Sequence, residues 1–362
     1  MHAPPPVTDS VDPHIHLWDV RGTPRRVRPL VRLLGWNRRL LDLAAKRLFP
    51  RDLLQFFGER NHALEDYLPP HYLGDARPAG ITQYVHVQAG WERPGPLGPV
   101  GETVWLEQLR RALGPLAPAG VVAYADLRLG DAVDEVLAAH RAASPATRGV
   151  RYMLTWHEHP LVHSYAPAPA LTRDPQWRRG YAALARHELS FDAWVYHEQL
   201  GELAALARDI PEVRVVLCHV GTPVGLGGSF HGIGADAGAR DRIRGAWLEG
   251  LAELAACPNV HCKLSGLTMP VIGFGFHERA HKPDVEELAA ALESPLRAAI
   301  DAFGVERCMF ASNFPVDKVS TTLDTLWRAF GRVVDRLELD DAARRRLFRD
   351  NARAFYRLNA AA

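Results

Sequence analysis

The stretch VDPHIHLWD, residues 11–19, is the starting point for interpreting the rest of the chain. Its mixture of alternating polar and apolar residues is typical of a β-strand. In a strand, residues i and i+2 point to the same face, so His14 and His16 share one face while Ile15 points away. Two imidazoles at a strand end can bind a metal ion or a substrate, or they can be ordinary polar residues.

Seven further strand-like runs follow, and helical patterns separate them. They are ITQYVHVQA (81–89), GVVAYADLR (120–128), RGVRYMLTW (148–156), LSFDAWVYH (189–197), EVRVVLCHV (212–220), NVHCKLSGL (259–267) and RCMFASNFP (307–315). Strands that alternate with helices form parallel βαβ units. Eight such units predict an α/β fold, a distorted (β/α)8 (TIM) barrel, with a doubly wound open sheet as the alternative. The first βα loop lacks GxGxxG, which argues against a dinucleotide site there.

The overall composition is that of an ordinary globular protein. The 362 residues are 47% hydrophobic and 23% charged, with a formal net charge of +1. We therefore expect a single barrel domain over 1–362 and no nucleic-acid partner. No apolar run reaches the roughly 18 residues of a membrane span. The start lacks the pattern of a secretory signal and the four cysteines form no CxxC pair, so we expect a cytoplasmic protein with reduced thiols.

Residues 21–60 interrupt the alternation of strand and helix. The segment is rich in Arg and Leu at helical spacing, with prolines as breaks. It predicts a helical insertion after the first strand that covers the barrel mouth as a lid or packs on a second subunit in a homo-oligomer. A basic amphipathic segment can also bind a membrane surface, so a peripheral membrane enzyme stays open as an alternative.

Polar side chains gather at the predicted carboxyl ends of the strands, where barrel enzymes have their active sites. They are His14, His16, His86, Gln88, Arg151, His197, His219, Lys263 and Asn313. An arginine inside a barrel needs a carboxylate partner or a substrate anion, so Arg151 is expected to bind a substrate carboxylate. His219 closes an apolar run that does not need a histidine for packing.

Three further residues are candidate substrate contacts. His86 and Gln88 project to the same face of their strand and are expected to contact the substrate together. Lys263 is a third candidate, although it can equally form a structural ion pair inside the barrel. The sequence therefore predicts an enzyme that acts on a small molecule.

The chain resembles the amidohydrolase superfamily, in the branch of sugar lactonases and 2-pyrone-4,6-dicarboxylate lactonase. The resemblance covers nearly the whole chain and rests on DPHIHLWD (12–19), VHVQAGWE (85–92), RGVRY (148–152), SFDAWVYHEQLGEL (190–203), VVLCHVGTPVG (215–225), CKLSGLTMP (262–270), MFASNFPVD (309–317) and NARAFYRL (351–358). It implies hydrolysis of a cyclic ester or amide in a barrel. By this resemblance His14, His16 and His197 are ligands of a divalent ion, zinc first, and His219 is the acid–base group.

The chain departs from that family pattern after the eighth strand. The relatives usually have Ser-Asp-Trp-Pro, and this chain has Ser312-Asn313-Phe314-Pro315. A neutral amide cannot act as a general base, so Asn313 would have a different catalytic role and the base would be His219. Three histidines alone can still hold zinc, and a mechanism without metal also stays open.

Two other functions compete with hydrolysis. A decarboxylase of the same superfamily would use the same histidines to orient a carboxylate for loss as carbon dioxide. A catalytically altered barrel would only bind a small ligand, with Asn313 marking the altered site. The retained histidines favour an enzyme over a binding protein.

Overall fold

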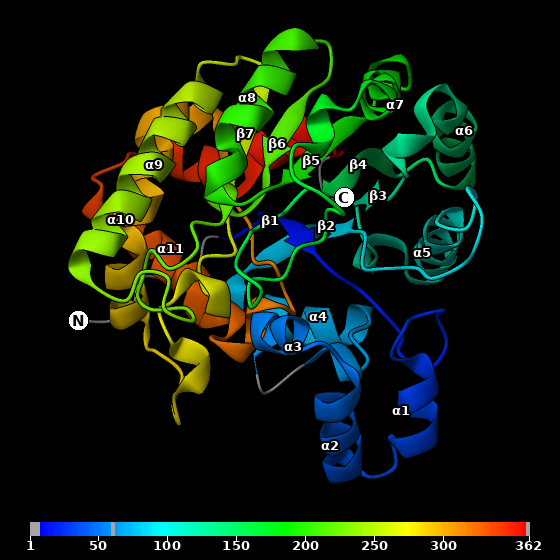
Figure 1. Ribbon diagram of the computed structural model, residues 1–362, viewed down its shortest axis with the longest axis horizontal. Helices are drawn as coiled ribbons and strands as arrows, with labels where there is room; N and C mark the ends of the chain where they lie inside the picture. The colour runs from blue at the N-terminus through cyan, green and yellow to red at the C-terminus, as the bar shows by residue number, and fades with distance from the viewer. Residues whose placement is uncertain (1–7, 59–61, 360–362) are drawn as a thin grey trace.

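The computed structural model describes residues 8–58 and 62–359, and within these residues eight parallel strands form one sheet in sequence order (Figure 1). The strands are β1 (Ser10–Ile15), β2 (Ile81–Val87), β3 (Gly120–Ala123), β4 (Thr147–Met153), β5 (Ser190–Trp194), β6 (Val215–Leu217), β7 (Val260–Leu264) and β8 (Cys308–Phe310). Each overlaps one of the eight predicted runs, so the (β/α)8 barrel is confirmed. The strands end earlier than predicted because their last residues already belong to the loops.

The barrel is closed by hydrogen bonds between β1 and the segment after β8. The Asn313 amide donates to the His14 carbonyl oxygen at 2.9 Å, and the His16 amide donates to the Phe314 carbonyl oxygen at 2.8 Å. Ile15 and Phe314 form the corresponding parallel bridge. Closure therefore places Asn313 beside the two histidines of β1, although about 300 residues separate them in the sequence.

Helices between the strands form the outer layer of the barrel (Figure 1). They are α4 (Pro69–Ala76), α5 (Val100–Leu113), α6 (Val133–Ala143), α7 (Pro175–Arg186), α8 (Leu200–Asp209), α9 (Ala237–Ala255), α10 (Val285–Phe303) and α11 (Leu323–Arg336). Local sequence explains where several of them begin. Asp174 caps α7 by accepting the Trp177 amide at 2.7 Å, and Pro175 occupies the first helical position.

The C-terminal helices close the amino end of the barrel. They are α12 (Asp341–Arg345) and α13 (Asn351–Tyr356), joined by a π-helical segment. Phe355 and Tyr356 pack with inward-facing strand residues such as Val85, Val216 and Met309 in one apolar cluster. The strand ends opposite this cluster are therefore the ones left for a site.

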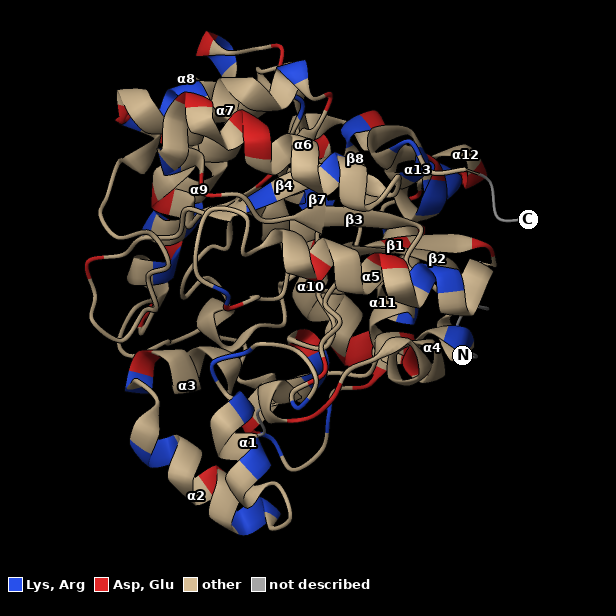
Figure 2. Cartoon of the chain, turned by 90° about the vertical axis from the view of Figure 1, so that its right-hand side faces the viewer, with Lys and Arg blue, Asp and Glu red and all other residues tan. Residues whose placement is uncertain are grey.

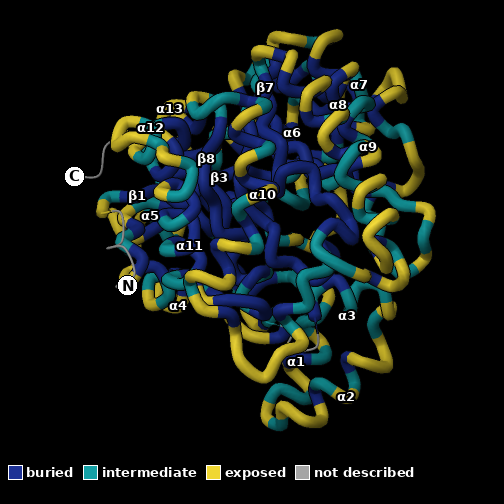
Figure 3. The backbone as a smooth tube through the Cα atoms, turned by 90° about the vertical axis from the view of Figure 1, so that its left-hand side faces the viewer, coloured by how far each residue is buried: buried dark blue, intermediate teal, exposed yellow. Residues whose placement is uncertain are grey.

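The segment after β1 folds into three helices, α1 (Arg28–Leu34), α2 (Arg38–Leu48) and α3 (Arg51–Phe57), which confirms the helical insertion. Positions 59–60 of the predicted range lie outside the described residues. The helices α1 and α2 project from the barrel and carry many basic residues (Figures 1 and 2). Much of the backbone of α1 and α2 belongs to exposed residues (Figure 3). Apolar side chains are among them, including Leu33 of α1 at 70% and Trp36, between the two helices, at 75%. Within the described residues, no helix has the length and apolar character needed to cross a membrane.

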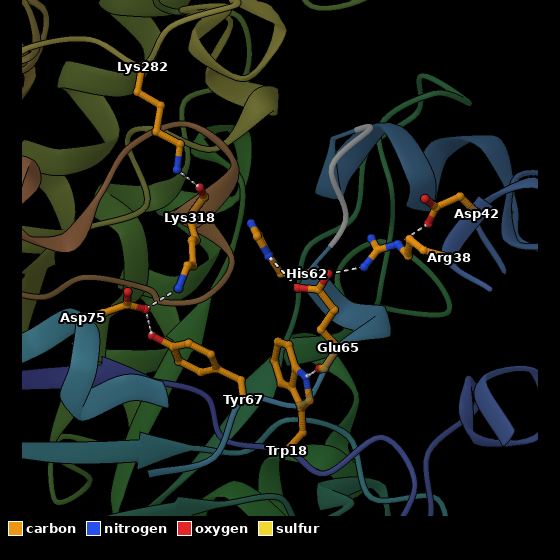
Figure 4. Close-up of polar contacts among 9 residues, drawn as sticks. All are labelled: Trp18, Arg38, Asp42, His62, Glu65, Tyr67, Asp75, Lys282 and Lys318. Atoms are coloured by element: carbon orange, nitrogen blue, oxygen red, sulfur yellow. Dashed lines mark hydrogen bonds and ion pairs between the residues drawn. The ribbon is translucent and has the colours of Figure 1, made fainter. Parts of the chain in front are cut away.

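Polar contacts connect the projecting helices to the barrel (Figure 4). Arg38 of α2 forms ion pairs with Asp42 and with Glu65. The backbone oxygen of Glu65 accepts a 2.6 Å hydrogen bond from the Trp18 indole, which follows β1. These contacts tie α2 to the chain that leaves the barrel at β1.

Candidate active site

A cavity of about 440 Å³ lies at the carboxyl ends of the strands, beneath the insertion. The barrel contributes a polar wall made of His16, Gln88, Arg151, Trp194, His219 and Asn313. The insertion contributes a mainly apolar wall that includes Phe49, Leu53, Phe56 and Phe57, together with Arg25 and Arg26. This combination of an apolar wall and a few convergent polar groups is typical of small-molecule sites.

His16 and His219 line this cavity, and the ring of His14 packs against both of them. The ring centroids of His14 and His16 are 5.0 Å apart, and those of His14 and His219 are 4.6 Å apart. His16 Nδ1 lies 2.8 Å from the Val87 carbonyl oxygen, which can only accept, so Nδ1 carries the proton. In neutral His16, Nε2 is therefore the nitrogen with a free lone pair.

All three histidines are held in the neutral form. Burial is the main cause that lowers the pKa of each imidazole well below its ordinary value. Nearby cations lower the pKa further, Lys263 for His14 and Arg151 for His16 and His219. A neutral imidazole can accept a proton, so His219 can serve as a base.

His219 is positioned by an unusual backbone conformation directly after β6. Its φ is 57°, and Val220 follows with a φ of 48°, which is rare for a β-branched residue. The Trp247 indole donates to the Val220 carbonyl oxygen at 2.7 Å and supports this turn. A Cβ at Gly266 would lie 2.5 Å from His219 Cγ, so only glycine allows the imidazole to occupy its place. His219 Nδ1 lies 2.9 Å from Ser265 Oγ, within hydrogen-bonding distance.

Lys263 lies inside the barrel as a structural cation and does not line the cavity. Its ammonium donates to Asp192 Oδ2 at 2.6 Å, to the Pro13 carbonyl oxygen at 2.8 Å and to His14 Nδ1 at 3.2 Å. The Tyr356 hydroxyl donates to the same Asp192 oxygen at 2.7 Å. Because His14 Nδ1 accepts a hydrogen bond from the Lys263 ammonium, the proton of neutral His14 is on Nε2.

The donor atoms near the histidines do not form a ready metal site. Among the described residues, the group whose ligand atoms all lie within 4.8 Å of one another is His14, Asp192 and Cys218. The Lys263 ammonium already contacts Asp192 and His14, so a positive charge lies where a metal ion would have to bind. In this tautomer His14 Nε2 carries the proton, and its Nδ1 lone pair is used by Lys263. The residues in this arrangement do not fit a divalent ion.

His197 does not join His14 and His16 beside the cavity. It begins the short helix after β5 and does not line the cavity, where β5 contributes Trp194 instead. His197 Nδ1 lies 3.5 Å from Glu198, and the same carboxylate lies 3.2 Å from His157. The position of His197 therefore does not favour its predicted role as a metal ligand.

The two candidates from β2 are separated by the fold. Gln88 lines the cavity and has a buried Nε2 without a partner among the described residues. His86 lies outside the cavity lining, where its Nδ1 accepts the Leu17 amide at 3.1 Å and its Nε2 lies 3.5 Å from Glu102. Its position indicates support of β1 rather than substrate contact.

Asn313 lines the cavity, and its side chain lies near the Asp317 carboxyl. Its Nδ2 is buried and has no partner among the described residues, and its φ of 58° is one that Asn tolerates well. Asp317, four residues on, does not line the cavity. Its burial raises the pKa of its carboxyl to about 7 despite nearby Thr268 and Asn313. A neutral amide donor thus stands where the family pattern has a carboxylate.

Sequence reasoning missed several residues of this site. Arg25 was treated only as part of a basic segment, yet it reaches the cavity wall. Gly266 follows β7 and leaves room for the His219 ring, and Asp192 pairs with Lys263. A polar residue inside an apolar strand was the available signal for Asp192. No local signal distinguishes Arg25 from its basic neighbours.

The fold and cavity define a (β/α)8-barrel enzyme whose chemistry takes place at the carboxyl ends of the strands. The family model described as Amidohydrolase matches residues 11–358. The chain therefore belongs to the amidohydrolase family and is an enzyme, as the sequence resemblance implied.

Individual relatives agree with this assignment. The chain is 33% identical to the uncharacterized protein y4mH of Sinorhizobium fredii over 348 residues, which covers 96% of this chain and 98% of that one. It is 32% identical to an L-fucono-1,5-lactonase of Burkholderia ambifaria, over 67% and 71% of the two chains.

A solved structure is also similar. The crystal structure of an amidohydrolase from Burkholderia multivorans with bound zinc is 25% identical and covers 97% of this chain and 100% of its own, with a TM-score of 0.67. The relatives thus include a lactonase and a protein that was crystallised with zinc.

Proposed function

We propose that this amidohydrolase hydrolyses a small cyclic ester, a lactone that carries a carboxylate. The observation that carries the proposal is that Arg151 of β4, His219 after β6 and Asn313 after β8 line one cavity. The lactonase among the relatives supports the ester as substrate. The hydrolysis of a related amide uses the same groups and is the nearest alternative within the class.

Each residue has a distinct role in the proposed reaction. Arg151 binds the substrate carboxylate, and Gln88 contacts the ring through its Nε2, which has no partner among the described residues. Neutral His219 takes a proton from water as the water oxygen bonds to the lactone carbonyl carbon. Asn313 Nδ2 donates to the carbonyl oxygen as negative charge develops there. The ring C–O bond then breaks, and His219 returns the proton to the leaving oxygen, which yields a hydroxy acid.

Zinc binding is an expectation from the sequence that this proposal does not require. A metal-bound water would supply hydroxide near neutral pH, and the sequence-derived ligand set is His14, His16 and His197. Because Lys263 contacts His14 and His197 lies apart, we route no step through a metal. The insertion acts as a lid over the single barrel domain, since its helix α3 lines the cavity. A cytoplasmic location and a homo-oligomer remain predictions.

The first test compares turnover of two lactones, neutral L-fucono-1,5-lactone and charged 2-pyrone-4,6-dicarboxylate, with a pH indicator that detects the acid formed. We expect turnover of the charged lactone and a loss of about 100- to 10,000-fold in His219→Gln. Gly266→Ala should also lose activity because the added Cβ displaces the His219 ring.

The matched control is Gly245→Ala in α9, where an added Cβ meets nothing within 4 Å. It should keep wild-type activity. Wild-type rates in His219→Gln would contradict the proposal. Release of carbon dioxide in place of acid would assign the decarboxylase alternative.

A further inference from the structure

Of the three arginines that line the cavity, Arg26 is exposed, whereas Arg25 and Arg151 have buried guanidinium nitrogens and come from different parts of the chain. Arg151 belongs to β4 and is 5% exposed. Arg25 lies in the insertion, ahead of α1, and burial lowers the pKa of its guanidinium to about 10. The Arg25 guanidinium also lies over the Trp18 ring, 4.7 Å from its centroid. The insertion therefore contributes a charged group to the site as well as an apolar cover.

The two arginines are held by consecutive carbonyl groups at the end of β2. Arg151 Nη2 donates to the Gln88 oxygen at 2.9 Å, and Arg25 Nη1 donates to the Ala89 oxygen at 2.6 Å. Each therefore uses one nitrogen to fix its orientation. The Nε of each arginine is buried and has no partner among the described residues. Donors thus remain available on both groups.

Neither arginine has a carboxylate partner. Among the described residues, no carboxylate oxygen lies within the 4.0 Å of an ion pair from Arg25 or Arg151, whereas Arg353 and Arg328 of the same chain both form such pairs. The acids nearest to Arg25 are Glu102, whose Oε1 accepts the Ala89 amide at 2.9 Å, and Glu92, which lines the cavity, and neither forms an ion pair with it. A buried cation without a paired anion is strongly disfavoured. Two such cations in one cavity indicate an anionic ligand.

We propose that Arg25 and Arg151 form a carboxylate-binding subsite, in which Arg25 of the insertion determines specificity for an anionic substrate. The inference rests on the proposed function, because it places the substrate carboxylate between the two guanidinium groups. Planar guanidinium groups suit the two oxygens of a carboxylate. Phe56 and Trp194 line the same cavity and would contact the apolar ring of the ligand.

Isothermal titration calorimetry with isophthalate tests the subsite without any turnover. Isophthalamide, which has the same shape and no charge, is the ligand control. We expect the wild-type protein to bind isophthalate and to bind isophthalamide at least tenfold more weakly. Arg25→Gln should weaken isophthalate binding at least tenfold, and Arg25→Lys should weaken it less because it keeps the charge.

The matched protein control is Arg39→Gln, an exposed arginine of the same insertion that does not line the cavity. It should bind isophthalate as the wild type does. Equal affinity of wild type and Arg25→Gln would overturn the subsite, and so would the absence of isophthalate binding to the wild type at millimolar concentration.

The two proposals fail in different ways. If isophthalate binds through Arg25 and no lactone is hydrolysed, the subsite stands and the hydrolase reaction is wrong. If a lactone is hydrolysed through His219 and Arg25→Gln leaves both isophthalate binding and KM unchanged, the reaction stands and the subsite is wrong.

Discussion

At the scale of single residues, the site combines backbone strain with neutral acid–base groups. His219 and Asn313 both have a left-handed backbone and both face the cavity. Such conformations persist only where the surrounding structure holds them, and here Gly266 and Trp247 do so for His219. The strain is at His219 and the β-branched Val220 that follows it, since Asn313 tolerates its conformation well.

Asp317 provides a pH-dependent prediction at the same scale. Its pKa is raised to about 7 in the folded protein from 3.8, so folding disfavours the ionised form. Its destabilising effect is absent below about pH 4 and grows as the pH rises to about 7. Asp317→Asn removes this effect and should be more stable than the wild type at pH 8, by up to about 4 kcal/mol.

Urea unfolding at pH 4.5, 6 and 8 measures this difference. The advantage of Asp317→Asn over the wild type should increase with pH across the series. The control is Asp301→Asn, at an exposed position of α10. Its difference from the wild type in free energy of unfolding should not increase with pH. A constant gap between the Asp317→Asn variant and the wild type would contradict the pKa shift of Asp317.

At the scale of elements, the insertion is attached to the barrel through α3 more than through α1 and α2. Phe56 of α3 is 2% exposed and packs on Trp194, with ring centroids 5.6 Å apart. The pair formed by His163 Nδ1 and Asp52 Oδ2, 2.6 Å apart, joins α3 to the loop after β4. Residues of α3 line the cavity, whereas those of α1 and α2 do not. The helix α3 is therefore the part of the lid that seals the site.

Removing the Phe56 ring should open the lid without unfolding the barrel. We expect Phe56→Ala to cost about 3 kcal/mol of local stability, because it empties a packed aromatic cluster. Hydrogen exchange should then accelerate in residues 51–57 and stay unchanged in β5. Leu43→Ala, at a site that is 53% exposed, is the control and should change neither. Faster exchange throughout the barrel in Phe56→Ala would show that α3 is part of the global folding unit.

At the scale of the whole molecule, barrel closure decides which groups meet. Asp192, Lys263, His14 and Tyr356 come from β5, β7, β1 and α13, and they form one buried network. Within this network, the Lys263 ammonium lies where His14, Asp192 and Cys218 could otherwise bind a metal ion. The closed barrel thus replaces a candidate metal cluster with an internal ammonium group.

The metal content of the purified protein tests this interpretation. We expect well below one equivalent of zinc by mass spectrometry, and the same value in a His14→Ala/His16→Ala variant. Lys263→Ala removes the ammonium and should gain zinc, because the three potential ligands remain in place. One equivalent of zinc in the wild type that is lost in the double variant would show instead that the histidines bind metal and that Lys263 moves aside.

The sequence by itself determined the fold and the general position of the site. Eight strand-like runs separated by helical patterns specify the barrel because side-chain periodicity is a local property. Barrel geometry then places His16, Gln88, Arg151, His219 and Asn313 around one opening, since the carboxyl ends of parallel strands share one end of the barrel.

Only the tertiary structure decided which polar groups are available for chemistry. A buried polar side chain is engaged or free according to neighbours that are distant in sequence. Lys263 forms an ion pair with Asp192 from another strand. His86 hydrogen-bonds the chain after β1 and does not line the cavity. Arg25 reaches the cavity because the insertion folds back over the barrel, which no local pattern encodes. Strand periodicity is set by adjacent residues, whereas the pairing of buried charges depends on how the closed barrel brings distant strands together.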